Sequence, residues 1–365
     1  MTQVDTVIIG AGPAGLAAAR GARSVGRSAL VIDDNWSGGG QIWRGQARQV
    51  EGVAFDFERQ VASLDELSYK RVILACGARE LFLPFPGWTL PHVTGAGGLQ
   101  ALVKNGLNVQ GKRVVVAGSG PLLLAVAANL AKAGAIVVLV VEQASWAKLS
   151  RFAFGLLGSP SKLAQGIELR NSKYRAGVWP VEAYEGGVRM SDGRRWSCDY
   201  LACGFGLTPN LELARHSGCA VEGGFVVVDE WQRTNVAGIY AVGEMTGIGG
   251  VEKAEAEGWA AGSGTKLAGE HGRFVNLLKT SFALRSELFS LATADTIVCR
   301  CEDVQLYKLE GMAGQREAKL QTRCGMGACQ GRICGPILGL IHGWETTRVR
   351  PPSVPLRIKD LCSKS

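Results

Sequence analysis

Short apolar runs and glycine-rich turns alternate along the chain. Residues 4–9 form an apolar run that stops at a glycine-rich turn, and an alanine-rich stretch at 16–25 leads to a second apolar run at 29–32. A short apolar run bounded by glycine is typical of a buried strand, whereas a longer alanine-rich stretch is typical of a helix. The order strand, turn, helix, strand predicts a βαβ unit and hence an α/β fold.

The first turn carries the spacing of a dinucleotide-binding loop. Gly10 allows the tight turn, Gly12 lets the backbone approach a pyrophosphate, and Gly15 lets the helix pack close to the sheet. Asp33 ends the second strand, where a carboxylate accepts hydrogen bonds from an adenosine ribose. The alternative is that the glycines serve packing alone. The pattern therefore predicts a nucleotide site made by Gly10, Gly12, Pro13, Ala14, Gly15 and Asp33.

The same pattern returns later in the chain. A strand at 113–117 runs into Gly118 and Gly120, a helix extends to residue 133, and a strand at 136–141 ends at Glu142, while Leu123 replaces the third glycine. An acidic residue at this strand end favours a free ribose 2′-hydroxyl, and therefore NAD over NADP. The alternative is a domain that keeps the fold without its ligand.

Two such units in one chain predict one Rossmann-like domain inserted in another. After the second unit, residues 238–244 form an apolar run with two glycines, and an alanine- and glycine-rich helix follows to residue 267.

The chain resembles the flavoprotein family with two dinucleotide-binding domains. The resemblance rests on the first loop, on Gly38-Gly-Gly-Gln-Ile-Trp-Arg44, on the Ala-Cys-Gly turn and on Tyr-Ala-Val-Gly-Glu244.

This resemblance implies FAD at the first loop, and NAD or another adenine nucleotide at the inserted domain. It adds Gly40, Gln41, Arg44, Gly77, Gly243 and Glu244 to the first site and assigns Gly118, Gly120 and Glu142 to the second. Glu244 stands where the family usually has an aspartate that binds the ribityl chain. Because the family usually has a longer segment between residues 41 and 75, the first site is open, covered by another subunit, or filled by a nucleotide smaller than FAD.

Five of the ten cysteines cluster near the end of the chain, at Cys299, Cys301, Cys324, Cys329 and Cys334. Zinc is one interpretation of such a cluster. The Cys-X-Cys pair is cramped for one tetrahedral zinc, whereas a 2Fe-2S cluster accepts thiolates from short glycine-rich loops. No redox pair of cysteines lies where the disulfide-reducing flavoproteins carry one. A dithiol mechanism is therefore not expected, and Cys76 is interpreted as a packing residue.

The cysteine segment resembles an iron-sulfur module similar to bacterioferritin-associated ferredoxin. This module occurs in α subunits of heteromeric opine oxidases, D-hydroxyproline and proline dehydrogenases, and hydrogen cyanide synthase. Cys-Arg-Cys-Glu302 and Gly325-Met-Gly-Ala-Cys-Gln-Gly-Arg-Ile-Cys334 carry the likeness. The resemblance implies Cys299, Cys301, Cys329 and Cys334 as ligands. It leaves Cys324 as a small neighbour or an alternative ligand.

The expected organisation follows from these segments. We expect an FAD-binding domain at 1–110 and 225–270, an inserted nucleotide-binding domain at 111–224 and a connecting segment at 271–295. A 2Fe-2S module at 296–350 and a tail at 351–365 complete the chain. The formal net charge is +8, but no run of five Lys or Arg occurs, so nucleic acid is not an expected partner. We expect no signal peptide or membrane span, and a soluble cytoplasmic protein.

The motifs favour electron transfer, because no constellation for hydrolytic catalysis is present and no residue is assigned a catalytic role. The leading hypothesis, implied by the resemblance, is the α subunit of a heteromeric flavin-dependent dehydrogenase. An FAD-containing β subunit then oxidises an opine, D-hydroxyproline, proline or glycine. Additional components are an FMN at the interface, an electron acceptor and a further small subunit. The alternatives are a stand-alone NADH-dependent reductase and a nucleotide-bound scaffold whose cofactor sites are partly vestigial.

Overall fold

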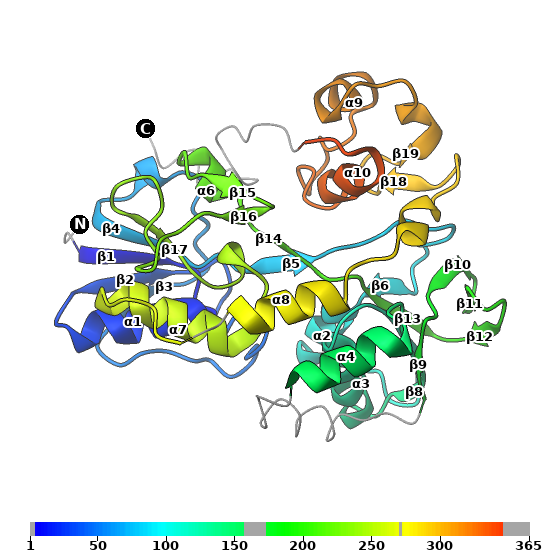
Figure 1. The fold of residues 1–365 in the computed structure, drawn as a ribbon, viewed down its shortest axis with the longest axis horizontal. Helices are drawn as coiled ribbons and strands as arrows, with labels where there is room; N and C mark the ends of the chain where they lie inside the picture. The colour runs from blue at the N-terminus through cyan, green and yellow to red at the C-terminus, as the bar shows by residue number, and fades with distance from the viewer. Residues whose placement is uncertain (1–3, 157–172, 270–271, 346–365) are drawn as a thin grey trace. The chain divides into compact units, whose positions relative to one another are not determined.

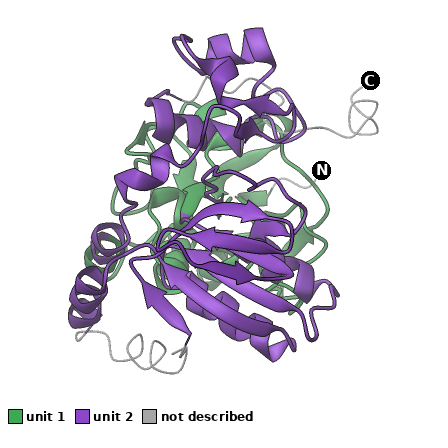
Figure 2. Ribbon diagram, turned by 90° about the vertical axis from the view of Figure 1, so that its right-hand side faces the viewer, with its two compact units in different colours: residues 1–79, 207–275, 348–365 green, residues 80–206, 276–347 purple. Residues whose placement is uncertain are grey.

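The computed structural model describes residues 4–156, 173–269 and 272–345. The chain divides into two compact units, each assembled from separate stretches of sequence. Within the described residues, the first contains 4–79, 207–269 and 272–275, and the second contains 80–156, 173–206 and 276–345 (Figure 2). The second unit is therefore an insertion in the first, and it also receives a later part of the chain.

A parallel five-stranded sheet forms the centre of the first unit, with strand order β17-β4-β1-β2-β3 (Figure 1). Its middle strand β1 pairs with β2 on one side and with β4 on the other, so that Ile8 lies opposite both Val31 and Ile73. All three side chains are fully buried, as the apolar runs predict. The strands are β1 (Val4–Ile9), β2 (Ala29–Ile32), β3 (Ala54–Asp56), β4 (Tyr69–Leu74) and β17 (Ile239–Ala241).

Two helices of the first unit, α1 (Pro13–Ser24) and α7 (Gly250–Ser263), pack against each other through small residues. A Cβ on Gly258 would collide with the carbonyl oxygen of Ala14, and one on Gly262 would collide with that of Ala18. Glycine is therefore required at both positions, because the two helix backbones approach closely. The alanine- and glycine-rich composition of both segments reflects this contact.

A second parallel sheet, with strand order β6-β13-β7-β8-β9, forms the centre of the second unit. Strand β7 lies between β13 and β8, and the buried residues Val114, Val116 and Val140 belong to the core that this sheet shares with its helices. The strands are β6 (Val93–Gly95), β7 (Arg113–Gly118), β8 (Ile136–Glu142), β9 (Tyr174–Ala176) and β13 (Tyr200–Gly204). The helices are α2 (Ala96–Lys104), α3 (Leu122–Lys132) and α4 (Trp146–Gly155).

Smaller elements complete the two units. An antiparallel sheet of β10 (Pro180–Tyr184), β11 (Gly187–Met190) and β12 (Arg195–Ser197) belongs to the second unit. The chain passes between the units in β5 (Ala78–Glu80), which pairs with β14 (Leu207–Pro209). The remaining first-unit elements are α6 (Glu212–His216), β15 (Val221–Glu222), β16 (Phe225–Val226) and 3-10 helices at Leu64–Glu66 and Gly243–Thr246.

A small lobe of short elements contains the cysteine cluster (Figure 1). Its own core includes Val298, Leu309 and Leu338 together with three of the cysteines. The helix α8 (Gly272–Ser281) and a 3-10 helix at Ser286–Ser290 precede it. The elements of the lobe are β18 (Ile297–Cys299), β19 (Val304–Gln305), a 3-10 helix at Leu306–Leu309, α9 (Gln315–Thr322) and α10 (Cys334–His342).

The observed units differ from the expected boundaries in two stretches. Residues 207–224 were expected in the inserted domain, but they belong to the first unit. Residues 80–110 were expected in the first domain, but they belong to the second unit, because β6 pairs with β13 and α2 packs on the same sheet. The expected tail at 351–365 and the last five residues of the expected module, 346–350, lie outside the described residues. Among the described helices, none is long and apolar enough to cross a membrane.

Candidate functional site

The first glycine loop joins β1 to α1. Gly10 has a φ of +107°, and a Cβ there would collide with the carbonyl oxygen of Ala75, while a Cβ on Gly15 would collide with that of Gly10. Gly12 differs, because no atom lies within 4 Å of the place where its Cβ would be. Gly40 packs on this loop, with Gly12 Cα 3.0 Å from where its own Cβ would be. The loop thus leaves open the position at which a phosphate approaches the backbone.

Asp33 lies at the end of β2 beside this loop, and its side chain is engaged with the backbone. It is 8% exposed, and it accepts hydrogen bonds from the Ala11 N–H at 2.5 Å and from the Asn35 N–H and Nδ2 at 2.8 Å each. The carboxylate therefore fixes the loop to the strand end. Its predicted contact with a ribose stays a prediction.

The turn at residues 38–40 and the residues after it also reach the first loop. The Gly39 N–H donates to the Ala11 carbonyl at 2.8 Å. Arg44 donates from Nε to Gln41 Oε1 and from Nη2 to Asn35 Oδ1, both at 3.2 Å. The structure therefore brings the predicted residues 40, 41 and 44 to the predicted loop, on the side of the strand end.

The Glu244 side chain lies at the N-terminal end of α7. Its carboxylate accepts hydrogen bonds from the Gly249 N–H at 3.3 Å and the Gly250 N–H at 3.1 Å. Burial raises the pKa of this carboxyl above its usual value. The side chain thus satisfies free amides of a helix start, and its predicted contact with a ribityl chain stays a prediction. The other predicted glycine, Gly77, accepts a hydrogen bond from the Asn210 N–H at 3.0 Å in the turn after β4.

A buried ion pair, which the sequence reasoning missed, holds the 3-10 helix at Gly243–Thr246. Lys253 Nζ lies 2.8 Å from Glu257 Oε1, and the two residues are 7% and 4% exposed. Lys253 also donates to the Gly243 carbonyl at 2.9 Å, while Glu257 accepts from the Gly243 N–H at 2.8 Å. The sequence pattern that could have indicated this buried pair is a lysine followed four residues later by a glutamate, in a helix rich in alanine and glycine.

The second glycine loop, between β7 and α3, is closed at its acidic residue. Gly118 has a φ of +146° and leaves no room for a Cβ beside the Gly204 carbonyl, as the motif requires. Glu142 is 0% exposed and accepts hydrogen bonds from the Gly120 N–H at 2.7 Å and the Ala144 N–H at 2.8 Å. Burial raises its pKa to about 7. The Glu142 carboxylate is thus bonded to backbone amides, as that of Asp33 is, and its predicted contact with a ribose stays a prediction.

The five clustered cysteines gather in two groups. The Sγ atoms of Cys299, Cys324 and Cys334 lie within 4.8 Å of one another, and all three residues are buried. Cys301 is exposed, and its thiol is hydrogen-bonded to Cys329. The four ligands implied by the resemblance are therefore divided between the two groups, Cys299 and Cys334 in one and Cys301 and Cys329 in the other, with Cys324 as a third thiol in the first group. Two thiols from each group would meet the need of two irons for two protein ligands each.

Positive side chains flank the cysteine groups. The Arg300 guanidinium lies 5.3 Å from the Trp88 ring centre, and Trp88 is a core residue of the second unit. Arg332 donates to the Cys329 carbonyl at 3.4 Å, and Arg323 pairs with Glu302 at 2.8 Å. Arg300 and Arg332 lie within or beside the cysteine loops and would offset the negative charge of thiolates there, whereas the charge of Arg323 is already paired with Glu302.

Cys76 and the other scattered cysteines have the environment of packing residues. Burial raises the pKa of Cys76 to about 12 and that of Cys198 to about 11. Both thiols therefore stay protonated near neutral pH, which makes them poor nucleophiles. The nine cysteines in the described part of the chain are all free.

The two loops and their parallel sheets define a Rossmann-like FAD/NAD-binding fold. A model of the NAD(P)-binding Rossmann-like domain matches residues 8–64, and that of the pyridine nucleotide-disulphide oxidoreductases matches residues 42–258, more than half of the chain. The chain belongs to the pyridine nucleotide-disulphide oxidoreductase family.

Relatives are similar over nearly the whole chain, which confirms the resemblance drawn from the motifs. A subunit of opine oxidase from Rhizobium meliloti is 30% identical, with 93% of this chain and 92% of that protein covered. Hydrogen cyanide synthase subunit HcnB of Pseudomonas protegens is 27% identical, with 91% and 90% covered. The fold is similar to that of L-proline dehydrogenase from P. horikoshii, with a TM-score of 0.68, 21% identity, and 99% of this chain and 79% of that chain covered.

Proposed function

We propose that this chain is the electron-transfer α subunit of a heteromeric flavin-dependent dehydrogenase. Oxidation of an amine or imino acid (an opine, D-hydroxyproline, proline or glycine) then takes place on an FAD-containing β subunit. The names of the relatives support this assignment, since one is a subunit of an opine oxidase and another a subunit of hydrogen cyanide synthase. The observation that carries the proposal is the pairing of thiols in a chain that also has a nucleotide loop.

The first glycine loop is the proposed FAD site. The open position at Gly12 and the start of α1 suit a pyrophosphate, because helix-terminal amides attract phosphate. Asp33 lies at the ribose end, and Arg44 adds a positive charge on the same side. A bound flavin supplies the ability to accept two electrons as a hydride. The residues of this chain would bind and orient the nucleotide.

The paired cysteines are the proposed ligands of a 2Fe-2S cluster, which supplies transfer of single electrons. Cys299 and Cys334 would hold one iron, and Cys301 and Cys329 the other. Cys324 then remains a buried small residue beside the first pair. Zinc is the alternative occupant that analysis of the metal distinguishes.

Metal analysis of the full complex, purified anaerobically from its native host, tests the cluster. We expect about two irons and two acid-labile sulfides per chain, and an electron paramagnetic resonance signal after reduction. Cys329→Ser is expected to lose the signal, whereas Cys219→Ser, at a buried free thiol in the first unit, should keep it. Zinc in place of iron in the wild-type complex would contradict the proposal.

The flavin assignment is tested by Gly12→Ala. Gly12 has a φ of −76° and no atom near its Cβ position, so alanine is compatible with the fold. The methyl group would stand where the pyrophosphate approaches, and we expect flavin content to fall at unchanged melting temperature. Gly314→Ala, at another open glycine, serves as the control. Normal flavin content in Gly12→Ala would argue against this loop as the FAD site.

The assignment of electron transfer to this chain and of amine oxidation to a partner chain is tested by adding each candidate amine to the isolated chain and to the complex. We expect the cofactors of this chain to be reduced only when the partner chain is present. Oxidation of an amine by the isolated polypeptide at the rate of the complex would overturn the assignment to an electron-transfer subunit.

A further inference from the structure

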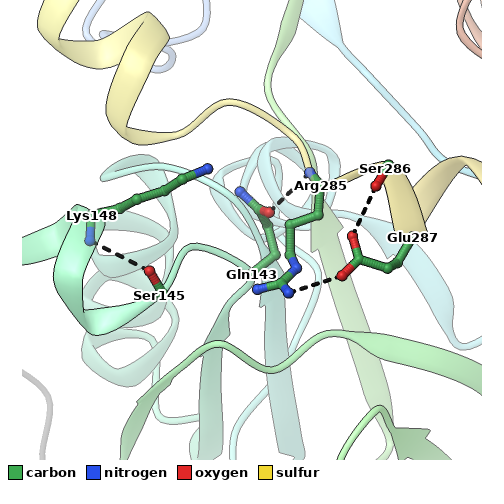
Figure 3. A pocket seen from close by; sticks show the side chains of 6 residues that line it. All are labelled: Gln143, Ser145, Lys148, Arg285, Ser286 and Glu287. Carbon is green, nitrogen blue, oxygen red and sulfur yellow. Dashed lines mark hydrogen bonds and ion pairs between the residues drawn. The ribbon is translucent and has the colours of Figure 1, made fainter.

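Residues 282–285, which lead toward the cysteine lobe, lie on the second glycine loop. The Ser119 hydroxyl donates to the Phe282 carbonyl at 3.1 Å. Gln143 donates from Nε2 to Ser119 Oγ at 2.9 Å and to the Ala283 carbonyl at 3.3 Å, and it accepts the Arg285 N–H at 3.3 Å. Figure 3 shows the Gln143 side chain directed at the backbone of Arg285. The segment is thus bonded to the glycine loop through Ser119 and to the turn after β8 through Gln143.

Side-chain packing adds to these bonds. The rings of Phe152 in α4 and Phe282 meet edge to face with centroids 4.8 Å apart. Leu277 lies so close to Gly155 that a Cβ there would be 2.6 Å from its methyl carbons. The Arg285 guanidinium lies 4.6 Å from the Trp179 ring centre. The segment is therefore also held by a ring contact at Phe282 and a cation–π contact at Arg285, and α8 before it packs on α4.

The polar groups around the second glycine loop already have hydrogen-bond partners within the chain. Glu142 and Gln143 are both 0% exposed, and Ser119 is 7% exposed. The Gly120 N–H, which a pyrophosphate would need, is donated to Glu142. A buried polar group is available to a ligand only after its present bonds are broken, which makes binding costly.

The space that remains beside the segment does not suit a dinucleotide. A cavity of about 290 Å³ lies between α4 and the segment, at the lower limit of the roughly 300–1,000 Å³ typical of ligand sites. Among the described residues, no aromatic or aliphatic side chain lines it, so an adenine ring would bury little apolar surface there. Its lining residues, drawn in Figure 3, are Gln143, Ser145, Lys148, Arg285, Ser286 and Glu287.

We propose that the second glycine loop holds residues 282–285 of its own chain in place of a dinucleotide. Ser119 and Gln143 act as positioning residues for the segment that enters the cysteine lobe. The second Rossmann-like domain then binds and positions the segment that leads into the cysteine lobe. Electrons from NADH or NADPH do not enter the protein at this domain. This inference concerns a site that the proposed electron-transfer function does not use.

Nucleotide binding to the full complex is the first test. Calorimetric titration with NADH and with NADPH should show no saturable binding to the second unit, and neither should reduce the cofactors anaerobically. Micromolar binding of either nucleotide that slows hydrogen exchange in β7 and the loop after it would overturn the proposal. Failure of the cluster test above would leave this result unaffected, because it depends on a different part of the chain.

Hydrogen exchange of residues 282–287 is the second test. Gln143→Ala and Ser119→Ala should each raise exchange in this peptide at least tenfold, while exchange in β7 and β8 stays as in the wild type. Ser119→Thr keeps a hydroxyl and should restore protection. Ser145 lines the same cavity, and its hydroxyl accepts a hydrogen bond from the Lys148 N–H in the first turn of α4, so Ser145→Ala is the matched control. Unchanged protection in both alanine variants would overturn the proposal, and the milder Ser119→Ala covers the case in which Gln143→Ala does not fold.

Discussion

Glu142 makes the stability of the protein depend on pH in a way that can be calculated. Burial raises its pKa from 4.5 to about 7, so between these values the folded state keeps a proton that the unfolded chain has lost. The free energy of unfolding therefore falls as pH rises through this window. At about 1.4 kcal/mol per pKa unit, the loss amounts to about 3 kcal/mol and is complete above pH 7.

Glu142→Gln removes this titration. The glutamine oxygen can accept only one of the two amides now bonded to Glu142, so we expect the variant to be less stable than the wild type at pH 5. Between pH 5 and pH 8 the free energy of unfolding of the variant should rise by about 2–3 kcal/mol relative to that of the wild type. Urea denaturation at four pH values measures it, with the exposed Glu185→Gln as the control. A difference that stays constant across the range would refute the reasoning.

Three further substitutions test other features. Gly262→Ala should lower the free energy of unfolding by about 1–3 kcal/mol in urea denaturation, because the new methyl collides with the Ala18 carbonyl and α7 must shift; an unchanged midpoint would contradict the close packing. Lys253→Met leaves Glu257 buried without its partner and should cost about 3–5 kcal/mol by the same measurement. Cys324→Ala should retain the full iron content of the complex, whereas loss of iron would make this cysteine a ligand.

The sequence predicted the framework of the fold well, since the pattern of apolar runs and glycines is local. The strands β1, β2, β7 and β8 and the helices α1 and α3 lie where the runs placed them. The three-residue strand β6 could not be found this way. Its place in the second sheet depends on pairing with β13, about 100 residues later, and a pattern of neighbouring residues carries no information on such pairing.

The sequence predicted where the candidate site residues lie along the fold, but not their burial or their hydrogen-bond partners. The spacing of the first loop identified glycines that the structure needs, and the position of Gly12 is open as expected. The state of the Glu142 carboxylate could not be predicted from spacing, because its hydrogen bonds come from the Gly120 and Ala144 amides as the folded backbone places them. Cysteine spacing likewise could not tell that Cys324 lies with Cys299 and Cys334.

The return of the chain to the first sheet has a consequence for synthesis on the ribosome. The edge strand β17 and the helix α7 are made only after the 127 residues of Glu80–Gly206 have been translated. Until then, the hydrogen-bonding edge of β4 and the alanine face of α1 have no partner. Nascent chains stalled before residue 239 therefore present an open strand edge to other chains, and they are the forms most prone to aggregate.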